Sequence, residues 1–168
     1  MKKVIILTLF IVFLTGCGLY NLDYFVMPDD TEFLIVLQSL DTPLKISDYM
    51  QSNFIGELHP FTAVDPYDLY ITGKGDCNDF STFGVFVANY HGYETYQIKM
   101  VLKDTIYIHY LGVYVEGNYS FTDNQVYYCD FNTFREIVEE SCRHINYECT
   151  SYKVYDYENN IIEMGVFY

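Results

Sequence analysis

The spacing of hydrophobic residues changes from a helical to a strand period near residue 92. Upstream of this point, apolar side chains recur every three or four positions, at Phe80, Phe83, Val87 and Tyr90. Asp76 is a favourable N-cap residue, and Asp79 three positions later gives a near capping box. His91 and Gly92 close the run. The sequence therefore predicts a helix that begins at Cys77 and buries its apolar face.

Strand-like segments follow this helix. They are rich in residues that favour strands and cover residues 93–102, 105–116 and 119–129. A turn at Glu116-Gly117-Asn118 joins the second segment to the third, which predicts an antiparallel hairpin. His109 lies in the second segment and Asp123 in the third. We therefore expect these two side chains on neighbouring strands, with Cys77 facing them from the helix end.

The rest of the chain predicts further helices and a final hairpin. One helix starts within Pro28–Glu32 and ends at Asp41–Pro43, and a second follows it; both are expected to cover one side of the sheet. Residues 58–74 show no regular pattern. The other expected elements are the second helix over 47–54, an amphipathic helix over about 131–144 and a hairpin with strands 151–157 and 161–168. This order of elements predicts an α+β fold.

The N-terminal segment is similar to the signal of a bacterial lipoprotein. Lys2 and Lys3 precede an apolar run from Val4 to Leu14, which is too short to span a bilayer as a mature helix. The run ends in Leu14-Thr15-Gly16-Cys17, which resembles a lipobox, where the cysteine is acylated, for example with palmitate, and becomes the new N-terminus. An ordinary signal peptide and an uncleaved anchor are the alternatives.

A lipid on Cys17 would define both the parts of the chain and its place in the cell. Residues 1–16 are then the signal peptide, 17–30 a membrane-proximal tether that carries apolar side chains of its own, and 31–168 one folded domain. The lipid would hold this domain on the outer, extracytoplasmic face of the cell membrane.

Acidic residues outnumber basic ones along the chain. The 23 Asp and Glu against 9 Lys and Arg give a net charge of −14, and loss of Lys2 and Lys3 with the signal would change it to −16. Such a surface repels the phosphate backbone of nucleic acids, so we expect no nucleic-acid partner. The 19 tyrosines and 13 phenylalanines are better explained by strand propensity than by a dedicated carbohydrate- or peptide-binding face.

Cys77 is the candidate nucleophile because of where it lies on its helix. Free N–H groups and the positive end of the helix dipole favour a thiolate there, and the same N–H groups can hold an oxyanion. The alternative is a buried cysteine that acts as a small hydrophobic residue. His109 and Asp123 favour the first interpretation, since a nucleophile, a base and a group that orients the base form a triad.

These segments resemble the transglutaminase-like cysteine enzyme superfamily over roughly residues 60–130. The matching pieces are Gly75-Asp76-Cys77-Asn78-Asp79-Phe80, His109 within residues 108–115, and Asp123 after Gly117-Asn118-Tyr119. The resemblance implies a papain-like or transglutaminase-like core in which the nucleophile helix packs on an antiparallel sheet. It also implies a Cys77–His109–Asp123 triad. The chain departs from the family pattern in having Tyr110 after the histidine and no tryptophan.

The resemblance implies cysteine-dependent acyl transfer at an amide, either a peptide bond or a glutamine side chain, in a protein or peptide substrate. Hydrolysis is favoured over cross-linking because the domain is small. The oxyanion would be held by the Cys77 N–H and a second donor, for which Tyr67, Tyr70 and Asn53 are candidates. Asn124 is the alternative orienter, although we expect its side chain on the opposite face of the strand. A non-catalytic binding lipoprotein and a cell-wall peptide hydrolase of another papain-like family are the alternative functions.

No cofactor or metal ion is expected. His59 and Asp65 lie in the irregular segment, but they show no paired spacing of metal ligands. Of the five cysteines, Cys17 is assigned to lipid and Cys77 to chemistry. Cys129, Cys142 and Cys149 remain, and in an oxidising compartment Cys142 and Cys149 are the simplest pair, although Cys142 fits equally as a core residue.

Overall fold

The computed structural model describes residue 22, residues 25–59 and residues 63–167. The expected signal peptide, Cys17 and residues 18–21, 23 and 24 of the expected tether lie outside these residues. Within the described part of the chain, no helix is both long and apolar enough to cross a membrane.

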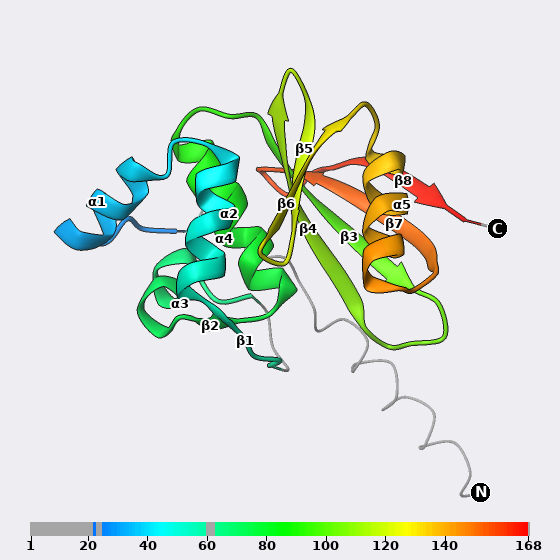
Figure 1. Ribbon diagram of the computed structural model, residues 1–168, viewed down its shortest axis with the longest axis horizontal. Coiled ribbons are helices and arrows are strands. Elements are labelled where there is room, and N and C mark those ends of the chain that lie inside the picture. The colour runs from blue at the N-terminus through cyan, green and yellow to red at the C-terminus, as the bar shows by residue number, and fades with distance from the viewer. Residues whose placement is uncertain (1–21, 23–24, 60–62, 168) are drawn as a thin grey trace, which may run out of the picture.

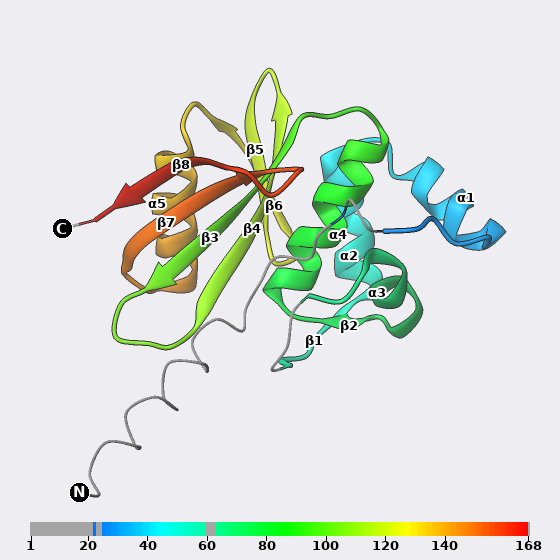
Figure 2. The same ribbon diagram turned by 180° about the vertical axis from the view of Figure 1, so that it is seen from behind.

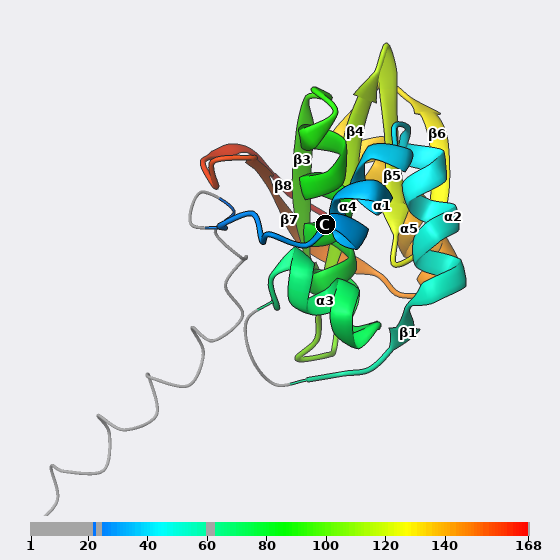
Figure 3. The ribbon, with the colours of Figure 1, turned by 90° about the vertical axis from the view of Figure 1, so that its left-hand side faces the viewer.

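The fold is α+β, as the sequence predicts, with a six-stranded antiparallel sheet between helices (Figure 1). The strand order is β6-β5-β4-β3-β7-β8, so consecutive strands pair with each other except at the centre, where β3 pairs with β7. Seen from the side, α4 lies on one face of this sheet and α5 on the other (Figure 3). From behind, α1 and the β7–β8 hairpin lie at opposite ends of the molecule (Figure 2). The strands of the sheet are β3 (Thr95–Leu102), β4 (Ile108–Glu116), β5 (Asn118–Asp123), β6 (Val126–Phe131), β7 (Cys149–Asp156) and β8 (Ile161–Val166).

The helices begin at polar caps that the sequence displays. Asp30 caps the first helix, Thr42 the second, and Asp76 and Thr133 each form a capping box. The helices are α1 (Thr31–Ser39), α2 (Pro43–Asn53), α3 (Pro66–Thr72), α4 (Cys77–Tyr90) and α5 (Phe134–Ile145), and a parallel pair of short strands, β1 (Ile55–Gly56) and β2 (Lys74–Gly75), precedes α4.

Three expectations from the sequence are wrong in detail. The segment expected to be irregular contains α3, which Asp65 and the left-handed Gly73 delimit. The second helix starts earlier than expected, because Pro43 occupies its first turn. The expectation that the first two helices cover one side of the sheet holds for α2, which contacts β5 and β6, whereas α1 belongs to the apolar cluster around α4.

The third expected strand is in fact two strands. Asn124 takes a left-handed conformation with φ of 53°, which reverses the chain between β5 and β6. The turn also holds α2 in place, because Ser47 Oγ donates a hydrogen bond of 2.6 Å to the Gln125 carbonyl and Gln125 Nε2 donates one to the Phe54 carbonyl.

Two apolar clusters, one on each face of the sheet, form the core. The first joins α1, α2 and α3 to the buried face of α4 and includes Tyr114 of the sheet. The second joins α5 to β3, β4, β5 and β7, with fully buried Ile98, Leu111 and Ile137. Alternate residues of β4 therefore face different clusters, as the period of a strand requires.

The contact between α4 and β4 depends on a helical glycine. Gly84 leaves room for the buried Tyr114 side chain, whose hydroxyl shares a hydrogen bond of 2.8 Å with Thr122 Oγ1. A Cβ atom at Gly84 would lie 2.3 Å from Tyr114 Oη. Close approach of helix and sheet, and not flexibility, explains this glycine.

We predict that Gly84→Ala destabilises the protein by about 1–3 kcal/mol because of this overlap. A loss of stability would itself be informative, because replacing glycine by alanine within a helix ordinarily stabilises it by about 1 kcal/mol. The free energy of unfolding in urea measures the effect. In a Tyr114→Phe background the nearest remaining ring atom is 3.4 Å away, so the same substitution should cost less. An equal cost in both backgrounds would contradict the assignment.

Candidate active site

The start of α4 is fixed by two carboxylates on either side of Cys77. Asp76 Oδ1 accepts hydrogen bonds from the N–H groups of Asn78, at 2.8 Å, and Asp79, at 3.4 Å. Asp79 Oδ2 accepts in return from the Asp76 N–H at 2.7 Å. This capping box makes Cys77 the first residue of the helix, where backbone N–H groups have no acceptor within the helix. The thiol therefore lies where both the N–H groups and the helix dipole favour negative charge.

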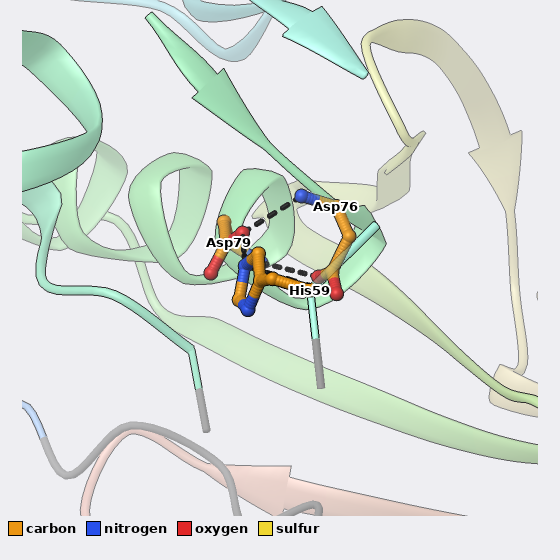
Figure 4. A group of neighbouring side chains, drawn as sticks. All are labelled: His59, Asp76 and Asp79. Atoms are coloured by element: carbon orange, nitrogen blue, oxygen red, sulfur yellow. Dashed lines mark hydrogen bonds and ion pairs between the residues drawn. The ribbon is translucent and has the colours of Figure 1, made fainter. Parts of the chain in front are cut away.

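A histidine that is distant in sequence joins this capping network (Figure 4). His59 Nε2 lies 2.5 Å from Asp79 Oδ2 and 3.9 Å from Asp76 Oδ2. The hydrogen bond to the buried Asp79 raises the pKa of His59, against the effect of partial burial. Asp79 also accepts a hydrogen bond from the Val64 N–H at 2.8 Å, so the network ties the preceding loop to the helix start.

These same three residues, His59, Asp76 and Asp79, offer potential metal-ligand atoms that lie within 4.8 Å of one another. The carboxylates of Asp76 and Asp79 already accept backbone hydrogen bonds of the capping box. Capping therefore explains why these side chains lie together. Asp65, which the sequence analysis considered with His59, instead caps α3 by accepting the Asp68 N–H at 2.8 Å.

His109 and Asp123 meet across β4 and β5. The two strands pair in antiparallel register with Leu111 opposite Asp123, which makes His109 a diagonal neighbour of the carboxylate. His109 Nε2 lies 2.7 Å from Asp123 Oδ1, and both side chains are almost fully buried. The expectation that these residues lie on adjacent strands is confirmed.

The structure also brings Cys77 to this pair. The Cys77 side chain is close enough to His109 to contribute to its pKa, and the Cys77 thiol donates to the Ile108 carbonyl oxygen at a distance of 3.8 Å. Burial lowers the pKa of His109, but the hydrogen bonds and charges of Asp123 and Cys77 outweigh it and raise the pKa to about 10. The Asp123 carboxylate beside the ring therefore favours the positively charged form of His109.

Ser141 extends the chain of hydrogen bonds beyond Asp123. This serine of α5 is completely buried, and its Oγ donates to Asp123 Oδ2 at 2.6 Å. The sequence analysis missed this residue, although Ser141 follows Ile137 by four positions and Val138 by three, and so lies on the apolar face of the helix. A small polar residue on the apolar face of an amphipathic helix is the sequence signal that could have identified Ser141.

A cleft of about 370 Å³ opens over Cys77 and His109. Apolar side chains dominate its walls, among them Leu58 from the loop after β1 and Tyr107 from the β3–β4 connection. The lining also includes the carboxylates of Glu57, which is ion-paired with Lys74, and Asp76, which caps α4. The full lining is Gly56, Glu57, Leu58, Gly75, Asp76, Cys77, Phe80, Leu102, Thr105, Tyr107, Ile108, His109, Asn124 and Tyr147.

None of the three side chains considered as the second oxyanion donor is in this lining. The Tyr67 hydroxyl donates to Asp30 Oδ2 at 2.8 Å, and Tyr70 packs with it on Phe33. Asn53 Nδ2 donates to the carbonyl of its own helix, at Tyr49. These candidates are therefore wrong, because α3 and the end of α2 turn them toward other partners.

Asn124 also differs from expectation. It follows the last residue of β5, so the alternation of a strand does not apply to it. Its side chain lines the cleft, and Nδ2 donates to Asp123 Oδ1 at 3.2 Å. Asn124 thus supports the carboxylate instead of pointing away from it.

Comparison with known proteins supports the fold. No protein-family model matches this chain, and no curated protein matches it. Among solved structures it is similar to Legionella pneumophila LapG in an EGTA-treated form, with 13% identity and a TM-score of 0.50. The alignment covers 81% of this chain and 79% of LapG. The likeness supports a papain-like or transglutaminase-like core.

Proposed function

We propose that this protein is a cysteine enzyme that transfers the acyl group of an amide through Cys77, His109 and Asp123, and that water is its usual acceptor. The single observation that supports this most strongly is the position of His109. Its imidazole lies 2.7 Å from the buried Asp123 carboxylate and interacts with the Cys77 side chain at the N-terminus of α4. A nucleophile, a base and an orienting acid in that order constitute the triad of acyl-transfer enzymes.

In the proposed reaction the Cys77 thiolate attacks the carbonyl carbon of a peptide bond or a glutamine side chain. The oxyanion forms beside the first N–H groups of α4, the Cys77 N–H among them. The protonated His109 gives its proton to the leaving nitrogen, and a thioester remains on Cys77. His109 then takes a proton from water, which attacks the thioester and releases a carboxylic acid and the free thiol.

Asp123 has a supporting part in this chemistry. It holds one ring nitrogen of His109 and stabilises the positive charge, while Ser141 and Asn124 hold the carboxylate itself. The open, largely apolar cleft suits a segment of a protein or peptide chain.

We predict that Cys77→Ala abolishes turnover of peptide amides. The assay follows new amino termini, ammonia release and incorporation of a primary amine, so that peptide hydrolysis, side-chain deamidation and cross-linking are told apart. Cys129→Ala is the matched control, because Cys129 is exposed on β6 and outside the cleft lining, and should leave the rate unchanged. If thiol alkylation at neutral pH modifies Cys129 but not Cys77, the catalytic proposal is wrong and a binding role is favoured.

We predict that kcat/KM falls at alkaline pH as the His109 imidazolium loses its proton. Its raised pKa means that the proton donor is present below about 10 and is lost as the pH rises through that value. Asp123→Asn removes a hydrogen bond and a charge that raise this pKa, so the alkaline limb should move to lower pH. We expect kcat/KM at neutral pH to fall roughly 10²–10⁴-fold. Circular dichroism checks that the variant folds; an unmoved alkaline limb in folded Asp123→Asn contradicts the role.

We also propose that the mature protein is anchored to the outer face of a membrane by lipid on Cys17. The support is the basic, apolar and Leu14-Thr15-Gly16-Cys17 sequence of the N-terminal segment. Mass spectrometry of the protein from a bacterial host should find an N-terminus at Cys17 with the added mass of acyl chains. A mature N-terminus elsewhere, or unmodified Cys17, would overturn this proposal and leave the catalytic one untouched.

A further inference from the structure

Two cysteines outside the cleft lie at the junction of α5 and β7. Cys142 is in the last turn of the helix, and Cys149 is the first residue of the strand. Between them Asn146 takes a left-handed conformation with φ of 57° that ends the helix, and the Tyr147 N–H donates to the Cys142 carbonyl at 3.2 Å. The chain thus turns back directly after α5, which brings the two residues to the same place.

The two side chains interact, since each shifts the pKa of the other. Both pack, half-buried, against the apolar cluster under α5, and the Cys149 thiol donates to the Ser151 carbonyl at 3.1 Å. The two cysteines also line the same surface hollow together with Tyr147 and Phe167, so a reagent can reach them. Cys129, by contrast, is exposed on β6, with its thiol 3.6 Å from Asp130 of its own strand.

We propose that Cys142 and Cys149 are an oxidation site that forms an intrachain disulfide bond. A dithiol gives up two electrons and two protons in this step, and the acceptor is a disulfide-bonded oxidant. The thiolate of one cysteine attacks the oxidant and releases one of its thiols; the other cysteine then attacks the protein sulfur of the mixed disulfide and releases the second thiol. The products are one protein disulfide and two oxidant thiols.

The interaction between the two side chains lowers the pKa of Cys149 and raises the pKa of Cys142. Exchange requires one of the two as a thiolate and the other beside it to complete the bond.

The disulfide bond would connect the last turn of α5 to the first residue of β7. Its position is one residue after Ser141, whose hydroxyl holds the buried Asp123 carboxylate. A link at this point would close a short loop and restrict the unfolded chain, and so it should raise the unfolding temperature by on the order of 5 °C.

Peptide mapping of the full chain tests this site directly. The protein is fully reduced, exposed to oxidised glutathione, blocked with N-ethylmaleimide and digested with trypsin. Arg143 separates the two cysteines, so the disulfide should join the peptides 136–143 and 144–153 into one mass that dithiothreitol splits. Separate peptides that each carry maleimide or glutathione would overturn the proposal, as would linkage of either to Cys129.

Matched variants separate this pair from the other thiols. Cys129→Ser should keep the joined peptide and the rise in unfolding temperature on oxidation, and a Cys77→Ala background should do the same because Cys77 lies in the other cleft. Cys142→Ser and Cys149→Ser should each lose both. A temperature rise that persists in these two variants would show that another thiol pair is responsible.

Discussion

A buried carboxylate is the constraint on which the site depends. Asp123 is only 5% exposed, and a carboxylate removed from water without partners costs several kcal/mol. Donors on three separate parts of the chain meet this demand: His109 of β4, Ser141 of α5 and the adjacent Asn124. The orientation of the imidazole therefore depends on strand register, on the docking of α5 and on the turn after β5 together.

A second buried carboxylate, that of Asp79 at the start of α4, is also satisfied by donors from separate parts of the chain. Asp79 is buried and accepts hydrogen bonds from His59 and from the N–H groups of Asp76 and Val64. One side chain thereby completes the helix cap and attaches the preceding loop to it. Cys77 is held by this arrangement without contributing to it, which leaves its thiol available to His109.

The sheet separates two apolar clusters yet joins the parts of the site. Cys77 comes from the helix on one face and Ser141 from the helix on the other (Figure 3), while β4 and β5 carry the residues between them. The close fit of α4 on β4, through Gly84 and Tyr114, fixes the distance of the helix from the strand. Packing that is remote from the thiol thus decides whether the thiol can meet the imidazole.

The sequence by itself determined the features that depend on neighbouring residues. The helix that starts at Cys77, the pairing of the strands of His109 and Asp123 and the amphipathic α5 all follow from caps, turns and hydrophobic period, which act over a few residues. Short elements were harder to predict from the sequence. The seven residues of α3 give too few turns for a period, and the turn at Asn124-Gln125 carries no glycine or proline to mark it.

Only the tertiary structure decided which distant side chains share a site. His59 reaches Asp79 over 20 positions and Ser141 reaches Asp123 over 18, and no local pattern encodes either contact. The same holds for Tyr67, Tyr70 and Asn53, whose residue types fit an oxyanion donor but which helix packing directs elsewhere. The physical reason is that a polar side chain is placed by whatever buried partner must be satisfied, and that partner is known only once the elements have packed.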